Sequence, residues 1–393
     1  MVRVLAPYVS VLGVPGARRL VLASLGGRLS FGLFDLALIV LVERTTGSFA
    51  LAGLAAGVHG AGIGLTAPMR GRLLDRFGAR RVLPPLTCAH ALSVAALPAV
   101  AGSAAAVVVL AALAGVTVPP LVAAMRLEWQ RMLGIGSQRL ATAYAFETTA
   151  QIAVFLVGPL VAAGGLALIG PEAPLLAAAL LVAVFGLRFA RIAEAEPHPS
   201  RPHLRGLGAI RHTGVRTLMA ATVLADAALG IVGVTVIAFA SERGSDAAGG
   251  VLLALFTAGA VIGGTVYGAR AWRTPPMPRL VAVLATFGAA LLALALADSL
   301  AALAVLLLLA GAPSAAQWAT TSVALDGFTP AGQGAEAATW LSSANAAGVA
   351  FGSILAGALV ERQGTSAAFG AAGALAIAAA LAVLAARPST SSA

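Results

Sequence analysis

Two charged side chains stand inside an apolar segment near the start of the chain. The segment reads GGRLSFGLFDLALIVLV from Gly26 to Val42 and contains Arg28 and Asp35. A charge at the centre of a bilayer costs at least about 2.5 to 3.5 kcal/mol, so such residues persist mainly where they face protein or water. On one helix the two would share a face about 10 Å apart along the axis, which is too far for a direct contact. Each charge therefore requires another partner or water.

Two further acids lie in apolar surroundings, Glu147 in AYAFETTAQ and Asp226 in VLADAALG. Three acids and one arginine do not cancel, so we hypothesise that at least one carboxyl group is protonated in some state, as desolvation favours. Such a group could carry a proton across the membrane. We rank Asp35 first and Asp226 second as proton-handling residues. Arg28 and Glu147 are either further members of this proton-coupling set or a structural ion pair, and the sequence leaves both readings open.

The composition is that of an integral membrane protein. Of the 393 residues, 60% are hydrophobic and 10% are charged, and the mean hydropathy is +0.95. At about 20 residues per spanning helix, this length accommodates about a dozen spans and leaves little for a soluble domain. All 25 basic residues are arginine, which excludes a P-loop lysine and Schiff-base chemistry. We expect no cofactor and no enzyme activity. We also expect no nucleic-acid partner, because the net charge of +10 is better explained as a topology signal.

The apolar runs and their breaks predict an all-α fold with twelve transmembrane helices. In the first half we expect them at about 20–42, 50–69, 82–101, 104–125, 141–168 and 173–190. In the second half we expect them at about 216–240, 247–268, 279–297, 300–325, 334–360 and 366–386. This pattern predicts an N-terminal bundle (1–190), a linker (191–215) and a C-terminal bundle (216–393), with the polar, proline-containing linker exposed to solvent.

The arginines predict the orientation. All but four of them fall at connections on one side of the predicted helices; Arg44, Arg243 and Arg362 fall on the other side, and Arg28 is internal. The positive-inside rule then places both termini and the linker in the cytoplasm. No small-residue cleavage site follows the first apolar run closely, so we expect that helix to be retained.

The two halves resemble one another in sequence. At an offset of 197 residues, several small residues coincide, including Gly53 with Gly250. At an offset of 194, ETTAQ (147–151) coincides with LSSAN (341–345), and Gly158 with Gly352. The two nearly equal offsets indicate a duplicated six-helix unit whose copies insert in the same orientation.

The second connection reads APMRGRLLDRFGARR from Ala67 to Arg81. A positive-inside loop explains its arginines but not Asp75, and we expect its glycines to allow a tight turn in which charge-assisted bonds join helix ends. Its pattern resembles the loop 2-3 signature of the major facilitator superfamily, carried by Gly71, Leu73, Asp75, Arg76, Gly78, Arg80 and Arg81. The resemblance implies two parallel six-helix bundles and a gating role for Asp75 and Arg76, which would bond to neighbouring helix ends in one state and release them in the other.

The fifth predicted helix contains the Gly158-Pro159 step within FLVGPLVAAGG. It resembles, in part, the signature of exporters in this family, although the glycine pair that follows is displaced. The alternative is a small-residue face for close helix packing. Many proton-coupled exporters of the family also carry an arginine in the fourth helix, four residues before a glycine, where this chain has Ala111 before Gly115. Proton coupling would therefore use other groups.

The resemblance implies a central cavity lined by helices 1, 4, 7 and 10. We expect it to be both aromatic and polar, which suits an amphipathic compound; the candidates are Phe31, Phe34, Gln317, Trp318, Trp340 and Asn345. His59 and His90 are mid-helix and are more typical of histidines bonded to a neighbouring helix. One cysteine, and histidines at spacings that fit no common ligand pattern, predict no metal site.

These features together predict a secondary transporter that works by alternating access. Its function would be proton-coupled export of small amphipathic compounds such as drugs or metabolites, with the substrate, protons and the lipid bilayer as partners. We expect a monomer in a bacterial inner membrane. The alternatives are an uptake permease or uniporter on the same fold, and a transport-inactive sensor or assembly partner.

Overall fold

The computed structural model describes residues 9–134, 137–194, 209–270, 272–329 and 334–386, and these are helical without any strand. The first half contains α2 (Ala17–Thr46), α3 (Phe49–Phe77), α4 (Ala79–Ala96), α5 (Ala104–Thr117), α6 (Leu121–Leu133), α7 (Gln138–Leu168), α8 (Glu172–Leu181) and α9 (Leu187–Ile192). The second half contains α10 (Thr213–Glu242), α11 (Asp246–Gly268), α12 (Pro276–Leu294), α13 (Leu300–Phe328) and α14 (Gly334–Ala385). Two short 3-10 helices, η1 (Pro98–Val100) and η3 (Ala209–Arg211), and one π-helical segment between α8 and α9, η2 (Val182–Gly186), are also present. The predicted all-α class is confirmed.

The helices form twelve spans. Ten stretches are long and apolar enough to cross a membrane. One of these, α14, is two helices joined at Gly364, whose φ of 85° breaks the helical path, and α4 supplies the twelfth span. The predicted linker falls mostly on residues 195–208, which lie outside the described residues.

The fourth span is broken, although the sequence predicted one helix over 104–125. The helix α5 ends at Thr117 and α6 begins at Leu121, with Pro119 and Pro120 between them. Proline has no amide hydrogen and its ring clashes with the preceding turn, so a pair of prolines interrupts the helix. The Arg70 side chain, buried on α3, donates to the Val118 carbonyl freed by this break and, at 2.7 Å, to the Ile63 carbonyl. This arginine of the predicted loop is thus part of the packed interior.

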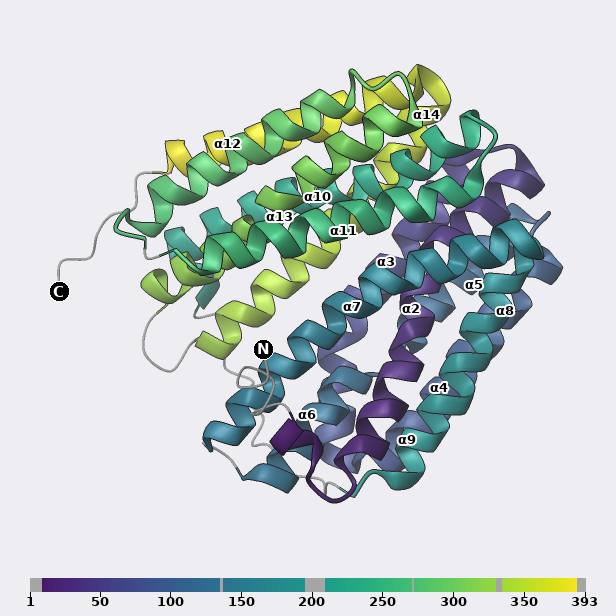
Figure 1. Cartoon of the computed structure of the whole chain (residues 1–393), viewed down its shortest axis with the longest axis vertical. Helices are drawn as coiled ribbons and strands as arrows, with labels where there is room; N and C mark the ends of the chain where they lie inside the picture. The colour runs from purple at the N-terminus through teal and green to yellow at the C-terminus, as the bar shows by residue number, and fades with distance from the viewer. Residues whose placement is uncertain (1–8, 135–136, 195–208, 271, 330–333, 387–393) are drawn as a thin grey trace.

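The two halves form two bundles that lie side by side, purple to teal and green to yellow in Figure 1. The contacts between them are made mainly by α3 with α14 and by α7 with α11. One apolar core runs through both bundles and includes Leu33, Phe34 and Leu36 to Val42 of α2 and much of α10 from Ala228 onward. A second core belongs to the first bundle alone, around Trp129, and a third to the second bundle alone, around Leu284. The interior is therefore continuous at one end of the molecule and divided at the other.

The continuous end carries the connection between α2 and α3, that between α10 and α11, and the kink at Gly364; we call it the arginine-poor end. Two close approaches join the bundles there. A Cβ built on Gly53 would lie 2.5 Å from the Ser353 carbonyl oxygen, and one built on Gly250 would lie 2.3 Å from the Pro159 carbonyl oxygen. Ser353 and Pro159 are 194 residues apart, so the two approaches occupy equivalent places in the internal repeat. Only glycine permits backbones to pack this closely.

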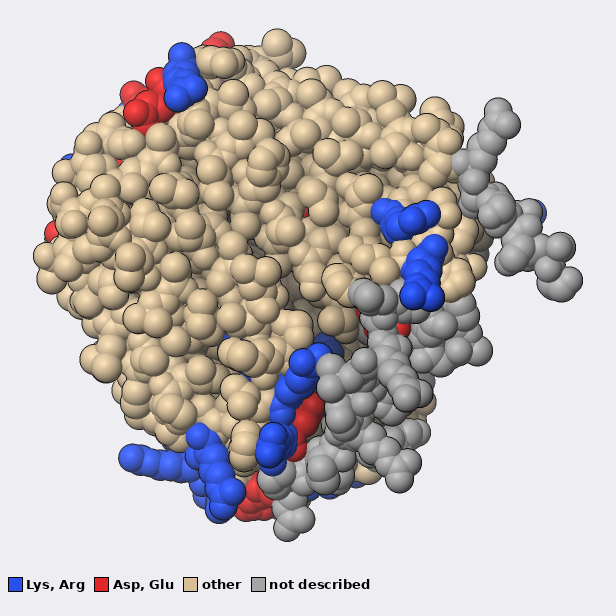
Figure 2. All heavy atoms as spheres, turned by 180° about the vertical axis from the view of Figure 1, so that it is seen from behind, with Lys and Arg blue, Asp and Glu red and all other residues tan. Residues whose placement is uncertain are grey.

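The surface agrees with a membrane location. Figure 2 shows charged side chains gathered near the edges of this face, with a broad uncharged surface between them. Exposed large apolar side chains include Leu65, Leu168, Val266 and Leu309. Such a band costs little in lipid and much in water.

Candidate functional site

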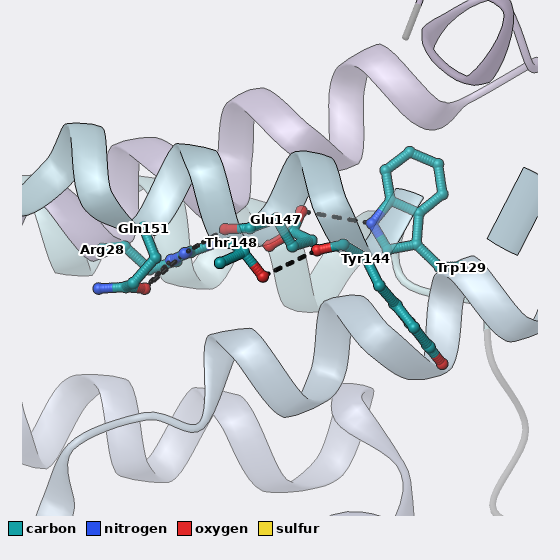
Figure 3. Close-up of polar contacts among 6 residues, drawn as sticks. All are labelled: Arg28, Trp129, Tyr144, Glu147, Thr148 and Gln151. Atoms are coloured by element: carbon teal, nitrogen blue, oxygen red, sulfur yellow. Dashed lines mark hydrogen bonds and ion pairs between the residues drawn. The ribbon is translucent and has the colours of Figure 1, made fainter. Parts of the chain in front are cut away.

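The first polar site is a buried cluster in the first bundle, drawn in Figure 3. The Arg28 guanidinium of α2 is 2.5 Å from the Glu147 carboxylate of α7, and its Nε donates to Gln151 Oε1 at 2.9 Å. The indole Nε1 of Trp129 donates to the second oxygen of Glu147 at 3.3 Å. Arg28 is fully buried. The structure thus forms the ion pair that the sequence offered as the alternative to a proton-coupling role for Arg28 and Glu147.

Asp35 has a different environment, although it is two helical turns from Arg28. Its side chain is 65% exposed, and its nearest charged or titratable partner is His59 Nδ1 of α3, 3.7 Å from Oδ1. The His59 ring packs against Phe34 with 4.1 Å between ring centroids, and its Nε2 is buried without a hydrogen-bond partner. His90 instead bonds to the Ala114 carbonyl at 2.8 Å.

Asp35 opens into a cavity of about 580 Å³ between the two bundles. Six helices surround it: α2, α3, α7, α10, α11 and α14. Most of the lining is apolar or glycine, and the polar lining residues are Asp35, His59, Thr257, Asn345 and Ser353. Cavities of this volume with few polar groups are typical of small-molecule sites.

The cavity includes some of the predicted substrate residues and not others. Phe31 and Asn345 line it, as does Pro159 of the Gly-Pro step. Phe34 is buried against His59, and Gln317 is buried within the second bundle. Trp318 and Trp340 pack against the third core, toward the arginine-rich end, which lies opposite the arginine-poor end. The sequence placed these four in a cavity by residue type and helix, whereas the rotation of each helix about its own axis decides which face meets the cavity.

Asp226 belongs to a second polar group, in the second bundle. It is fully buried on α10, and its carboxylate interacts with the side-chain amides of Asn345 and Gln317. Neither carboxylate oxygen has a hydrogen-bond partner of good geometry. Asn345 also lines the cavity, so it stands between Asp226 and the cavity.

The comparison with known families explains the duplicated architecture. A sequence model of the Major Facilitator Superfamily matches residues 20–221 and again residues 218–393. The chain belongs to the Major Facilitator Superfamily. No curated protein matches it in sequence.

Several solved structures share this fold. The nucleoside transporter NupG has a TM-score of 0.79 at 15% identity, covering 94% of this chain and 98% of NupG. A peptide transporter POT in complex with sulfate has a TM-score of 0.76 at 17% identity, covering 95% and 94%. The human organic anion transporter MFSD10 has a TM-score of 0.65 at 19% identity, covering 94% and 99%. At these identities the likeness concerns the fold, so the Major Facilitator architecture of this chain is established while its substrate is not.

The superfamily's loop 2-3 signature lies mostly within a helix. The sequence predicted a loop with turns at Gly71 and Gly78, but α3 continues to Phe77 and Gly71 is an ordinary helical residue. Gly78, with φ of 75°, makes the turn alone. Arg76 in the last helical turn favours this extension, because a positive charge there interacts favourably with the helix dipole.

The gating residues of this signature are unpaired in the described part of the chain. Asp75 forms no ion pair or hydrogen bond there, and the Arg76 guanidinium lies 5.1 Å from the centroid of the Phe77 ring. Arg80 donates to the Ala193 carbonyl at 2.7 Å. The contact of Arg80 joins the start of α4 to the end of α9.

Charged contacts link the two bundles at the arginine-poor end. Arg44 at the end of α2 is 2.5 Å from Asp246 at the start of α11. Glu361 of α14 accepts from the Ser48 hydroxyl and the Ala50 amide, both at 2.8 Å, and so caps the N-terminus of α3. The sequence analysis did not predict these contacts. The partners lie far apart in the chain, and charged residues at helix ends are common on protein surfaces.

The cavity residues His59, Phe155 and Phe256 were also missed. The sequence did contain one signal for the bundle contacts. Gly53 and Gly250 coincide in the internal repeat, and a glycine repeated at equivalent positions indicates a repeated close approach.

Proposed function

We propose that this protein is a proton-coupled secondary transporter that exports small amphipathic compounds. The observation that carries the proposal is Asp35, an exposed carboxylate in an otherwise mostly apolar cavity between two bundles. The positive-inside rule favours an arginine-rich end in the cytoplasm. The bundles would then be closed on the extracellular side.

Alternating access would follow from rocking the bundles about the cavity. Closing an apolar cavity over an ionised Asp35 is costly, and a proton or a bound substrate removes that cost. Asp35 would therefore permit the transition only when it is occupied. Asp75 and Arg76 would act as the gate at the cytoplasmic end, open in this conformation and bonded to neighbouring helix ends in the other.

The test is transport by purified protein in proteoliposomes with an imposed pH gradient. A panel of amphipathic compounds would be compared between wild type, Asp35→Asn and Asp298→Asn, the last removing an exposed acid in the loop between α12 and α13. We expect uphill movement of some compound against proton flow in wild type and in Asp298→Asn, and loss of coupling in Asp35→Asn. Retained coupling in Asp35→Asn would reassign the proton site to Asp226 or Glu147.

Uptake is the second candidate, favoured by the similarity to structures described as nucleoside and peptide transporters. It uses the same cavity and differs in the direction of coupled flux. Substrate accumulation in the same direction as proton flow would support uptake, and accumulation against it would support export.

A further inference from the structure

We propose that the cavity between the bundles binds monovalent organic cations with an aromatic or aliphatic body, and that the cation and a proton exclude one another at Asp35. The exclusion rests on the proposed coupling to protons, whereas the charge preference rests on the cavity alone. The preference follows from the charged groups that face the space and from those that do not.

Asp35 is the one acidic side chain on the described lining. Among the six surrounding helices, α3 contributes His59, and α7, α10, α11 and α14 contribute no titratable side chain. No arginine lines the cavity. The wall therefore carries one negative charge when His59 is neutral.

The nearest arginines are engaged elsewhere. Arg28 is fully buried and bonded to Glu147 and Gln151, and Arg70 is buried and bonded to two backbone carbonyls. Neither can turn toward the cavity without leaving a buried acceptor unpaired. Such a loss of a buried partner lowers the unfolding free energy of the protein. An anionic ligand would meet a negative wall with no compensating cation.

The remaining lining suits the body of such a ligand. Phe31, Phe155 and Phe256 come from three different helices and surround the space together with aliphatic side chains. Aromatic faces attract organic cations through their quadrupole, and apolar walls favour a hydrophobic body. A sugar or another highly hydroxylated compound would find only Thr257, Asn345 and Ser353 as neutral polar partners.

The same carboxylate accounts for the exclusion. A protonated Asp35 is neutral and no longer attracts the cation, and a bound cation disfavours the proton. Binding of one monovalent cation to the protonated site releases one proton, so the exchange leaves the net charge of the cavity unchanged. Transport by this exchange would respond to a pH gradient and not to membrane potential.

The test uses probes of similar shape and different charge, measured against protein in nanodiscs with empty nanodiscs subtracted. They are tetraphenylphosphonium, tetraphenylborate and the neutral triphenylphosphine oxide. We expect wild type to bind the phosphonium at least about tenfold more tightly than the borate, since a partly desolvated charge contact is worth about 1.4 kcal/mol or more. We expect Asp35→Asn to lose about tenfold in phosphonium affinity and to keep binding of the phosphine oxide, which shows that the cavity is intact. Asp35→Glu should restore the preference, and Asp298→Asn should not alter it.

The exclusion has its own readout. Phosphonium affinity should fall as the pH falls, and this dependence should persist in His59→Asn but disappear in Asp35→Asn. Equal binding of phosphonium and borate by wild type, or a pH dependence that follows His59, would overturn the proposal. The proposed function and the cation preference can fail separately. Cation binding without any gradient-driven transport would contradict the proposed coupling. Coupled transport restricted to neutral or anionic compounds would contradict the cation preference.

Discussion

The two bundles differ in how their buried carboxyl groups are paired. In the first, Arg28, Glu147, Gln151 and Trp129 form a closed set in which the charges are paired and hydrogen-bonded. In the second, the positions equivalent to Glu147 and Gln151 at an offset of 194 are Leu341 and Asn345. There Asp226 is buried beside Asn345 without an arginine and without a well-formed hydrogen bond.

The difference shows that the two copies of the repeat contain different buried polar groups. A buried ion pair with all partners in place resists change, because removing either member leaves an unpaired charge. A buried carboxyl that has only amide neighbours lacks an opposite charge to compensate its ionised form. Asp35 belongs to neither class, since its side chain is exposed and faces the cavity. The comparison therefore separates a paired buried cluster, a carboxyl buried without a cation, and a carboxyl exposed to the cavity.

The largest expected effect comes from breaking the paired buried cluster. Glu147→Leu leaves Arg28 buried with only Gln151 and a backbone carbonyl as acceptors, so we expect a loss of about 3 to 5 kcal/mol in unfolding free energy. Denaturant titration or thermal melting in a fixed detergent would measure it. The double variant Arg28→Met/Glu147→Leu should recover most of the loss. If Glu147→Leu is no less stable than wild type, the cluster is not structural.

The next effect concerns the paired glycine approaches. Gly53→Leu or Gly250→Leu places atoms where a backbone carbonyl stands 2.5 or 2.3 Å from the built Cβ, so we expect each to separate the bundles at the arginine-poor end. Spin labels at Gly102→Cys and Asp298→Cys, in a Cys88→Ser background, would show a longer distance. Gly370→Leu is the control, since nothing lies within 4 Å of its Cβ position. An unchanged label distance in both leucine variants would contradict the account.

A smaller effect is expected from the charged links at the same end. Arg44 is partly exposed, so removing its ion pair by Asp246→Asn should cost about 0.2 to 1 kcal/mol, which shifts the population of the closed end about 1.4- to 5-fold. Glu361→Gln should act similarly by weakening the cap on α3. The same label pair would report both shifts. High salt should reproduce the first shift in wild type; a salt-independent distance distribution would argue against it.

The smallest effect is expected at Asp226. Because the carboxyl has no well-formed hydrogen bond and no cation beside it, Asp226→Asn should alter the unfolding free energy by less than about 1 kcal/mol and should leave coupled transport intact. Melting and gradient-driven transport would be measured on the same preparation. Loss of coupling with unchanged stability would move the proton site from Asp35 to Asp226 and would reverse the distinction drawn between them.

The sequence by itself determined the membrane location, the twelve helical spans and the superfamily, because apolar length, arginine placement and the motif around Asp75 are properties of the chain read in order. It also identified Arg28, Asp35, Glu147 and Asp226 as charges that need an explanation. An unpaired charge in an apolar helix is unfavourable, and this can be recognised before its partner is known. Hydropathy alone did not reveal the break at Pro119 and Pro120.

Only the tertiary structure decided which of those charges meet. Arg28 and Asp35 share a helix, yet one is sealed by α7 and the other opens into the cavity. Partner choice depends on the rotation and tilt of each helix, and these are set by packing at positions such as Gly53 and Gly250, whose contacts come from the other half of the chain. For the same reason Trp318 and Trp340, which the sequence offered to the cavity, pack in the third core instead.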